Sequence, residues 1–301
     1  MVQTQNLLKE VKEYNIEISS DVVLAPYTSF KIGGPAKWFC SPKNEEELKT
    51  ILSLCKKYNV RYYFFGRGSN VLFADEGFDG VIIHIGTHLS DIKAEGNHII
   101  AQAGAPLAQI CNTAAENGLA GLEFAFGIPG CLGGAVFMNA GAYGGEMKDV
   151  VESVTYINYN GEIVTKPGSE LEFGYRTSCF QHNGGCILQA RLSLETGDKA
   201  AIQEKMQGYL KSRADKQPLD MPSAGSAFKR PVGAFAGQLI QECGLRGFSV
   251  GGAAISTKHC GFVVNTGNAT CKDVLTLADE VCRIVTEKTG FTLEKEIRVV
   301  R

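Results

Sequence analysis

The chain reads Gly66-Arg67-Gly68-Ser69-Asn70 directly after the apolar run at 62–65 and directly before Val71-Leu72-Phe73. A glycine-rich turn is therefore set between two strand-like stretches. Two glycines without Cβ atoms let consecutive backbone N–H groups converge on an anion, and the Ser69 hydroxyl and Asn70 amide add donors. We predict a phosphate-binding loop at residues 66–70, against the alternative that it is an ordinary surface turn, since such turns use Gly and Asn routinely.

A second glycine-rich stretch strengthens the prediction. Residues 127–145 read Gly-Ile-Pro-Gly-Cys-Leu-Gly-Gly-Ala-Val-Phe-Met-Asn-Ala-Gly-Ala-Tyr-Gly-Gly, a density of small residues that no regular helix or strand requires. A large, flat, phosphate-bearing ligand is expected against both stretches. A nicotinamide-type Rossmann fingerprint is disfavoured because the third glycine is missing and a strand follows the loop. The absence of Gly-Lys-Ser/Thr excludes a P-loop.

Length and charge limit the remaining classes. A chain of 301 residues suits roughly two domains. The formal net charge of -2, from 30 basic and 32 acidic residues, provides no basic field for nucleic acid. The first 20 residues carry charges throughout and contain no apolar stretch suited to a signal peptide or membrane span. We expect a cytoplasmic, monomeric protein that binds neither nucleic acid nor membrane.

The cysteines and histidines do not predict disulfides or a metal site. The ten cysteines are scattered without a Cys-x-x-Cys pair, so most are expected to be small buried hydrophobic residues in a reducing compartment. The five histidines form no His-x-x-x-His or Glu-x-x-His spacing. His84, which alternates with two isoleucines, is interpreted as a solvent-facing or hydrogen-bonded strand residue, and no metal is expected.

Local patterns predict mixed helices and strands up to about residue 195. Asn44 followed by three glutamates predicts an N-capped helix that ends near Tyr58. Asn160-Gly161 is the strongest short-range hairpin signal in the chain. After residue 195 helical patterns dominate, and a terminal strand is predicted over 293–300. This shift in composition places a domain boundary at about residue 195.

Five motifs occur in the order found in one enzyme family. They are residues 66–72, the loop from Pro129-Gly130 to Gly144, Gly174-Tyr175-Arg176-Thr177-Ser178, Ala224-Gly225-Ser226-Ala227-Phe228-Lys229 and Leu293-Glu294-Lys295-Glu296-Ile297-Arg298. From about Pro26 to its C-terminus, the chain resembles the UDP-N-acetylenolpyruvoylglucosamine reductase family, whose members are also called UDP-N-acetylmuramate dehydrogenases. Its spacing resembles the shorter subtype, which lacks an extra tyrosine-bearing loop.

The resemblance implies an α+β fold, with a two-lobed FAD-binding region of the vanillyl-alcohol-oxidase type followed by a smaller α+β substrate-binding domain. We expect the FAD-binding region at 1–195, with an N-terminal helix and lobes at about 20–75 and 76–195. The substrate-binding domain is expected at 196–301, with its C-terminal strand returning to the active site. FAD is the implied cofactor and NADPH the implied reductant. The implied reaction converts UDP-N-acetylglucosamine enolpyruvate to UDP-N-acetylmuramate for peptidoglycan, and thus serves cell-wall synthesis, cell shape and division.

The resemblance also assigns the cofactor contacts. Glycines in both loops let the chain approach the diphosphate or the flavin ring, and residues 139–141 are expected to bond the ring or ribityl edge through main-chain groups. The predicted cofactor-binding residues are Gly66, Arg67, Gly68, Ser69, Asn70, Pro129, Gly130, Gly133, Gly134, Asn139, Ala140 and Gly141. Cys131 stands where the family more often has serine or threonine, a departure that removes one hydroxyl.

Three residues match the family's catalytic positions: Arg176, Ser226 and Glu296. Arg176 is implied to bind the substrate carboxylate with a planar guanidinium as negative charge grows there. Ser226 is implied to be the general acid, and Glu296 to assist protonation or polarise the carboxylate, which requires a raised pKa. Pattern alone would give Arg176 a surface position and Ser226 a flexible loop. Strand alternation would place Glu296 on a solvent face.

The substrate contacts are expected at Tyr143, Tyr175, Lys216, Lys229 and Arg230. The three cations suit a diphosphate, although lysines on a solvated face are the default interpretation. The family often has asparagine at the place of Arg230.

Two other functions stay open at this point. One is a different FAD-dependent oxidoreductase or oxidase on the same scaffold, although the loop at 66–70 contains no histidine for covalent flavin attachment. The other is a non-enzymatic nucleotide-binding module. It would explain the glycine loops but leave Arg176, Ser226 and Glu296 without a purpose.

Overall fold

The computed structural model describes residues 2–301, which form two compact units. The first unit contains the residues up to Ser20, residues 38–67 and residues 80–212. The second unit contains residues 21–37, 68–79 and 213–301. The chain therefore enters the second unit three times, and that unit is assembled from segments far apart in the sequence.

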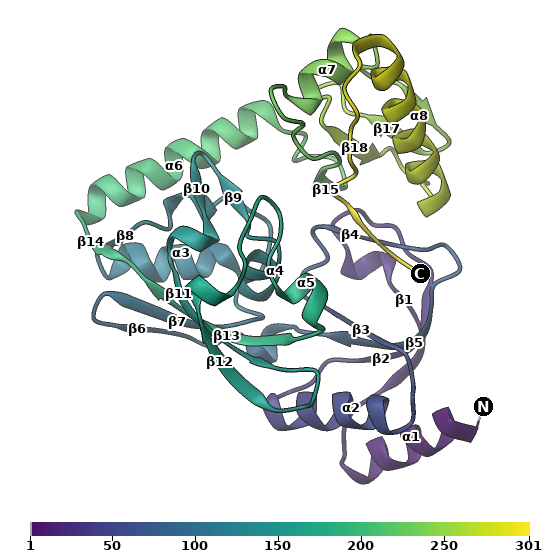
Figure 1. The fold of residues 1–301 in the computed structure, drawn as a ribbon, viewed down its shortest axis with the longest axis vertical. Coiled ribbons are helices and arrows are strands. Elements are labelled where there is room, and N and C mark those ends of the chain that lie inside the picture. The colour runs from purple at the N-terminus through teal and green to yellow at the C-terminus, as the bar shows by residue number, and fades with distance from the viewer. Residues whose placement is uncertain (1) are drawn as a thin grey trace. The chain divides into compact units, whose positions relative to one another are not determined.

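The largest sheet of the first unit has five antiparallel strands (Figure 1). In spatial order they are β12 (Ile163–Pro167), β11 (Val151–Ile157), β13 (Cys186–Ser193), β7 (His98–Gln102) and β6 (Ile92–Glu95). The hairpin predicted at Asn160-Gly161 is confirmed, because it joins the antiparallel strands β11 and β12, with Gly161 at φ +85°. A positive φ is the conformation for which glycine is suited.

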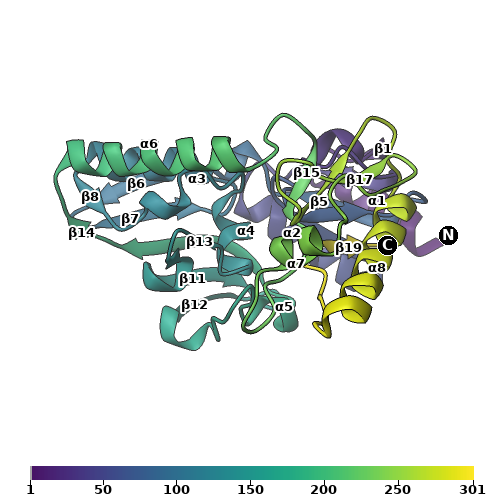
Figure 2. The ribbon, with the colours of Figure 1, turned by 90° about the horizontal axis from the view of Figure 1, so that it is seen from above.

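The helices of the first unit surround one apolar core, which extends from Leu7 to Met206. Their bounds are α1 (Val2–Glu13), α2 (Glu45–Lys57), α3 (Leu107–Glu116), α4 (Leu132–Phe137), α5 (Phe180–Asn183) and α6 (Lys199–Lys216). The last turn of α6 already belongs to the second unit. Helices α1 and α2 pack against each other (Figure 1), and α3 and α6 run side by side (Figure 1 and Figure 2).

The cap predicted for α2 is confirmed. The Asn44 Oδ1 atom accepts a hydrogen bond of 2.9 Å from the backbone N–H of Glu47, and three glutamates occupy the first turn. A carboxylate at this end interacts favourably with the positive end of the helix dipole. Leu48, Ile51 and Cys55 of α2 are fully buried. Burying an aliphatic side chain of this size stabilises the fold by about 1.5–3 kcal/mol.

Short strand pairs and 3₁₀ helices lie in the segments that connect the larger elements. They are the antiparallel pairs β8 (Leu119–Ala120) with β14 (Glu195–Thr196) and β9 (Gly141–Ala142) with β10 (Gly145–Glu146). The 3₁₀ helices are η2 (Thr87–Leu89), η3 (Glu123–Ala125), η4 (Met147–Asp149) and η5 (Gly168–Glu170), with η1 (Ala25–Tyr27) in the second unit.

Four further strands have the order β1 (Ser19–Val23), β2 (Pro35–Cys40), β5 (Phe78–His84) and β3 (Tyr62–Phe65). Strands β1, β2 and β5 carry the chain from one unit into the other. Within the first unit β3 and β5 are parallel, with Phe65 opposite His84. The centre of the His84 ring lies 5.8 Å from that of Phe39 and 5.2 Å from that of Phe65, and its Nδ1 atom is 3.2 Å from Ser41 Oγ. This histidine is therefore a satisfied polar residue, one of the two alternatives that the sequence left open.

The second unit contains an antiparallel sheet and two helices. The strands, in order, are β15 (Ser223–Ser226), β18 (Phe262–Asn265), β17 (Ala253–Ile255) and β16 (Ser249–Val250), and the helices are α7 (Ala236–Glu242) and α8 (Cys271–Thr289). Thr270 and Asp273 form a capping box at the start of α8. The Asp75 carboxylate also accepts from the backbone N–H groups of Cys271 and Lys272, at 2.7 and 3.0 Å. Segment 68–79 is thereby attached to the N-terminal end of α8.

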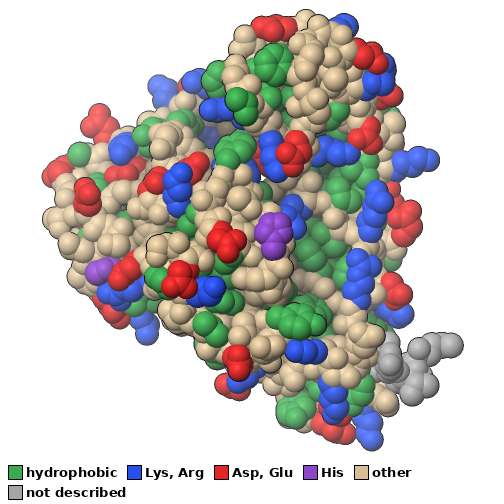
Figure 3. All heavy atoms as spheres, in the orientation of Figure 1, with side chains coloured by type: hydrophobic (Ala, Val, Ile, Leu, Met, Phe, Trp, Pro, Cys, Tyr) green, Lys and Arg blue, Asp and Glu red, His purple; other side chains and the backbone are tan. Residues whose placement is uncertain are grey.

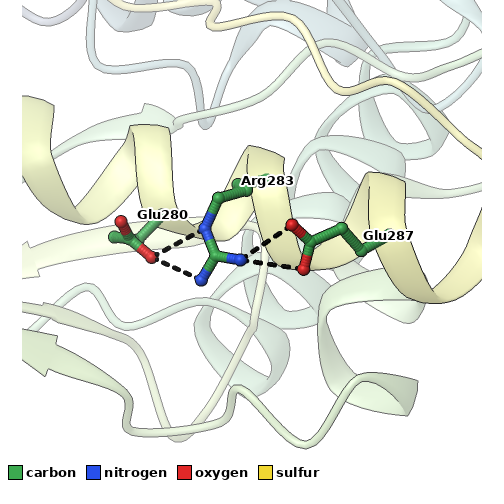
Figure 4. Close-up of polar contacts among 3 residues, drawn as sticks. All are labelled: Glu280, Arg283 and Glu287. Carbon is green, nitrogen blue, oxygen red and sulfur yellow. Dashed lines mark hydrogen bonds and ion pairs between the residues drawn. The ribbon is translucent and has the colours of Figure 1, made fainter.

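An ion-pair network lies along the exposed side of α8 (Figure 4). Arg283 extends between Glu280, one turn before it, and Glu287, one turn after it. Its Nη1 atom donates to both carboxylate oxygens of Glu287 at 2.8 Å. More than half of the Arg283 side chain is exposed, so solvent and salt screen these pairs and their effect on stability is small.

The terminal strand is shorter than the sequence predicted. The prediction covered 293–300, whereas the only regular strand is β19 (Arg298–Val300), which pairs in parallel with β4 (Val71–Phe73). Residues 294–296 instead bond to 227–229: the Glu296 N–H donates to the Ala227 carbonyl, and the Lys229 N–H donates to the Glu294 carbonyl, both at 2.8 Å. The prediction was wrong because the segment changes partners after Glu296, which interrupts a single regular ladder.

The predicted burial of most cysteines is confirmed. All ten cysteines are free thiols, and all except Cys282 are buried. Burial raises the pKa of the Cys55 thiol to about 12, which keeps it protonated and unreactive.

Charged side chains of both signs are interspersed over the face shown in Figure 3. Among residues 2–301, no helix combines the length and the apolar character needed to span a bilayer. On this face, acidic and basic side chains are mixed, and neither sign gathers in a single patch, in keeping with the net charge of only -2.

Candidate active site

The predicted phosphate loop lies between β3 and β4, and the chain passes from the first unit to the second between Arg67 and Gly68. A strand follows it, as expected. None of the backbone N–H groups of residues 66–70 donates a hydrogen bond to another described residue. Gly68 has φ +60°, and a Cβ there would lie 2.5 Å from the Tyr27 carbonyl oxygen. The loop thus presents donors to an anion with a backbone that requires glycine.

Gly66 and Cys131 bring the two glycine-rich stretches together within the first unit. A Cβ on Gly66 would lie 2.2 Å from the Cys131 Sγ atom, which is far inside van der Waals contact. Cys131 is buried and directly precedes α4. Glycine at position 66 is therefore required by the thiol that packs against it.

Replacing Gly66 with alanine is expected to lower the free energy of unfolding by about 1–3 kcal/mol, the usual cost of overpacking, and to weaken flavin binding. In the double variant Gly66→Ala/Cys131→Ala the nearest atom of residue 131 would be its Cβ, 3.8 Å away, so most of the loss should be recovered. Chemical denaturation and titration of apoprotein with FAD measure both quantities. Cys131→Ala alone is the control, and an equal loss from Gly66→Ala in both backgrounds would contradict the packing argument.

The second stretch, residues 127–145, contains α4. The Gly133 N–H donates to the Ala103 carbonyl at 2.8 Å, and the Gly130 carbonyl accepts from the Leu107 N–H at 3.1 Å. The helix ends where the N–H groups of Asn139 and Ala140 donate to the carbonyls of Val136 and Ala135. These bonds occupy the N–H groups of Asn139 and Ala140, and the Ala140 carbonyl accepts from the Met147 N–H at 3.0 Å. The Asn139 carbonyl and Gly141 are therefore the main-chain candidates for cofactor contacts.

The side chain of Asn139 is completely buried and used by the protein itself. Its Nδ2 atom donates to the Gly174 carbonyl at 2.9 Å and to Glu146 Oε2 at 3.1 Å, while its Oδ1 atom accepts from the Lys148 N–H at 2.9 Å. Hydrogen bonding to Lys148 holds the pKa of Glu146 below its ordinary value. Asn139 therefore joins the glycine-rich segment to the turn that carries Arg176.

Arg176 lies at the tip of a tight turn in the first unit. Gly174 and Thr177 exchange two backbone hydrogen bonds of 3.2 Å, and Arg176 itself has φ +56°. Its Nη2 atom donates to the Gly141 carbonyl at 3.2 Å, and its guanidinium carbon lies 5.1 Å from the centre of the Tyr175 ring. The structure thus brings the predicted catalytic arginine to the predicted cofactor residues of segment 139–141.

Tyr143 lies at the tip of the β9–β10 hairpin, with φ +53°. Its ring stacks on Tyr209 of α6, with centres 4.2 Å apart and planes 2° from parallel, and its hydroxyl donates to the Tyr209 carbonyl at 2.9 Å. Tyr143 is 41% exposed and Tyr175 is 48% exposed. Both predicted substrate residues therefore present ring surface to solvent in the first unit.

In the second unit, Ser226 ends β15 at an irregularity. The pairing of β15 with β18 shifts register between Ser223 and Ser226, and Gly225 has φ +77°. Bulges of this kind redirect a side chain out of the regular alternation. Ser226 is exposed, so its hydroxyl lies on the surface of the unit.

Glu296 and Asn70 lie next to β15, the strand that ends at Ser226. The Asn70 Nδ2 atom donates to the Glu296 carbonyl at 3.3 Å, and the Asn70 carbonyl accepts from the Arg298 N–H at 3.1 Å. The Glu296 N–H in turn bonds the residue after Ser226. The second unit therefore brings together one predicted cofactor residue and two predicted catalytic residues.

The predicted cations of the second unit have different surroundings. Lys229 Nζ is paired with Glu294 Oε1 at 2.5 Å, and the Arg230 guanidinium lies 4.5 Å from the centre of the Phe235 ring. Lys216 is exposed near the end of α6. Lys229 and Arg230 are therefore positioned by contacts with neighbouring side chains. Lys216 instead lies on a solvent-exposed face, which is the usual place of a lysine.

No sequence motif points to two residues that organise this region, Glu146 and Gln181. Glu146 accepts from Asn139, and Gln181 donates to the Arg176 carbonyl at 2.9 Å. Neither belongs to a recognisable motif, because their roles depend on contacts between loops.

One cavity of about 400 Å³ lies elsewhere, between α3 and α6, with Asn112, Glu116, Gln203 and Glu204 among its lining residues. It contains none of the predicted site residues. We therefore locate the candidate site by the chemistry of the loops rather than by cavity size.

Comparison with known proteins identifies the class and the family. Residues 36–166 match the model of an FAD binding domain, and residues 217–300 match that of the UDP-N-acetylenolpyruvoylglucosamine reductase C-terminal domain. The UDP-N-acetylenolpyruvoylglucosamine reductase of Clostridium novyi is 45% identical over 302 residues, covering 100% of this chain and 98% of its own. That of Clostridium perfringens strain SM101 is 48% identical over 288 residues, covering 95% and 94%.

A crystal structure of the Thermus caldophilus UDP-N-acetylenolpyruvylglucosamine reductase is 37% identical, with a TM-score of 0.80, and covers 95% of this chain and 99% of its own. The fold and the two glycine-rich stretches thus define an FAD-containing oxidoreductase, and the predicted fold class is confirmed. Within that class, the chain belongs to the UDP-N-acetylenolpyruvoylglucosamine reductase family.

Proposed function

We propose that this protein catalyses the NADPH-dependent, FAD-mediated reduction of UDP-N-acetylglucosamine enolpyruvate to UDP-N-acetylmuramate. The observation that carries the proposal is the identity of 45% along the whole chain to a relative with the reductase name. The product is a peptidoglycan precursor, so the proposed place of action is the cytoplasm. Loss of the enzyme would impair cell-wall synthesis, and with it cell shape and division.

FAD fits the residues that the two stretches provide. The N–H groups of residues 66–70, without acceptors among the described residues, suit its diphosphate. Gly133, Gly134 and Gly141 let the backbone approach a flat ring closely. We assign Pro129 and Gly130 to the same side of the flavin-binding site. When bound, FAD would supply a hydride, taken from NADPH, to the terminal vinyl carbon of the enol ether. We propose residues 1–195 as the FAD-binding region and 196–301 as the substrate-binding domain.

Arg176 is proposed to hold the carboxylate of the substrate. When hydride adds to the terminal carbon, the electrons of the double bond move toward that carboxylate and form an enediolate. A planar guanidinium can bind both oxygens, and these charge-assisted bonds strengthen as negative charge develops. The contact of Arg176 with Tyr175 supports this role, because stacking limits the orientations of the guanidinium.

Ser226 is proposed to give its proton to the carbon next to the carboxylate, which completes the lactyl ether. A hydroxyl is a weak acid, so the transfer requires a strongly basic acceptor and replacement of the proton from water or a neighbouring group. Glu296 is proposed to polarise the carboxylate through a shared proton. The bond between the Glu296 N–H and the residue after Ser226 supports a common task for these two residues.

The nucleotide end of the substrate is proposed to contact Tyr143, Tyr175, Lys216, Lys229 and Arg230. An arginine can bind a diphosphate with two parallel hydrogen bonds from its planar guanidinium, and a lysine can bind it as a compact positive charge. The exposed ring surfaces of the two tyrosines suit a flat or sugar-like partner. The proposed partners are thus small molecules, with the protein acting as a monomer.

Anaerobic stopped-flow absorbance tests the proposal. Protein reduced with NADPH is mixed with UDP-N-acetylglucosamine enolpyruvate, and the flavin band is followed. Rapid reoxidation without oxygen is expected. A flavin that stays reduced until oxygen enters would instead favour an oxidase on the same scaffold, and a protein purified without a tightly bound flavin would favour a nucleotide-binding module.

A further inference from the structure

Arg176 stands in a backbone conformation that side chains rarely adopt. Its φ of +56° lies in the left-handed region, where the Cβ crowds the following carbonyl. Such conformations persist where the surroundings fix them, and they concentrate at functional sites. The contacts that fix this backbone are therefore part of how the guanidinium is aimed.

Gln181 supplies one of these contacts. Its Nε2 atom donates to the Arg176 carbonyl at 2.9 Å and to the Phe137 carbonyl at 3.2 Å. The Gly174–Thr177 bonds close the turn on either side of Arg176, but they do not hold the Arg176 carbonyl itself. Since a peptide unit is planar, fixing that carbonyl fixes the ψ angle of Arg176.

The other end of the Gln181 contact lies on the segment that carries the predicted cofactor residues. Phe137 is the last residue of α4, whose final carbonyls have no partner within the helix. Its carbonyl accepts from Gln181 and also from Ser178 Oγ, at 2.8 Å. The side-chain amide of Gln181, a residue of α5, thereby connects the end of α4 to the peptide group of Arg176.

We propose that Gln181 is a positioning residue, which sets the direction of the Arg176 guanidinium relative to segment 137–141 through its two carbonyl contacts. The inference deepens the proposed function and rests on it, because it requires that Arg176 binds the substrate carboxylate. Gln181 touches neither the substrate nor the flavin in this role. It acts only through the backbone of Arg176.

Three variants test this role. Gln181→Met keeps the length and shape of the side chain but removes its N–H donors, whereas Gln181→Lys keeps donors. Gln238→Met is the matched control, since Gln238 is exposed on α7 and donates only to Glu242, at 2.8 Å. Flavin reduction by NADPH, reoxidation by the enolpyruvyl substrate and the Kd of the substrate for oxidised protein are measured for each.

Gln181→Met is expected to lower kcat/KM for the substrate by about 10- to 100-fold, the usual cost of misplacing a catalytic group slightly. Its substrate Kd should rise, its flavin reduction should stay unchanged, and Gln181→Lys should recover part of the loss. In an Arg176→Ala background no guanidinium remains to be positioned, so Gln181→Met should then cost almost nothing further.

Three results would overturn the inference. The first is a Gln181→Met protein that behaves like the Gln238→Met control. The second is an equal loss in the wild-type and Arg176→Ala backgrounds, which would show a general structural role. The third is a parallel loss of flavin reduction. A different result would overturn the proposed function itself: failure of the wild-type protein to reduce the enolpyruvyl substrate. It is distinguishable from the other three results because it appears without any substitution.

Discussion

Replacing Arg176 with lysine is expected to slow reoxidation of the reduced flavin by the enolpyruvyl substrate by roughly 10²–10³-fold. An ammonium keeps the positive charge but cannot bind two carboxylate oxygens as a planar fork. It would also lose the present contact of the guanidinium with the Tyr175 ring, 5.1 Å away, and the bond to the Gly141 carbonyl. Stopped-flow measurement of the two half-reactions separates this loss from any effect on flavin reduction, which should be unchanged.

Arg283→Lys is the matched control for this substitution. Arg283 also makes bidentate contacts, but with Glu287 on the exposed side of α8, and its replacement should leave both half-reactions intact. Wild-type turnover in Arg176→Lys would exclude bidentate binding of the carboxylate. A loss confined to flavin reduction would move Arg176 from the substrate to the reductant.

Replacing Ser226 with alanine should leave flavin reduction by NADPH fast and lower reoxidation by the substrate by roughly 10²–10⁴-fold, the range for removal of a positioned general acid. Hydride addition would still be possible, but the enediolate could return its electrons before it is protonated. Single-turnover absorbance measures the reoxidation rate. Mass analysis of product formed in deuterated water measures the protonation step independently.

Ser249→Ala provides the control for Ser226→Ala. Ser249 belongs to β16 of the same sheet and is exposed, so it tests the loss of a surface hydroxyl from this unit. If Ser226→Ala reoxidises as fast as the wild-type protein, the serine is not the proton donor. In that case Glu296, whose N–H bonds the residue after Ser226, becomes the next candidate.

Features that depend on neighbouring residues could be predicted from the sequence. Asn44 caps α2 because its side chain needs only the backbone three residues later, and Gly161 turns the hairpin because only one residue must adopt a positive φ. The two ends of α8 are local features of the same kind, since Thr270 caps its first turn and Gly290, in the left-handed conformation, ends it.

Features that depend on distant segments could not be predicted in this way. The contact between Gly66 and Cys131 joins loops that no periodicity relates, and the exchange of partners after Glu296 breaks a strand whose alternation looked regular. For the candidate site, the family's motifs led to the loops that carry Arg176 and Ser226. The motifs do not contain Gln181, because it contacts the backbone carbonyls of Phe137 and Arg176, which no particular side chain marks in the sequence.

The parallel pairing of β19 with β4 has a consequence for synthesis of the chain. Asn70 and Glu296, which meet beside this pairing, are 226 residues apart, so residues 296–300 leave the ribosome long after segment 68–79. Strand β4 must therefore wait for its partner strand until residue 300 has been synthesised. Contacts of such long sequence separation slow folding and expose unpaired strand edges meanwhile. A nascent chain that stalls before residue 296 would consequently expose the edge of β4 to chaperones and proteases.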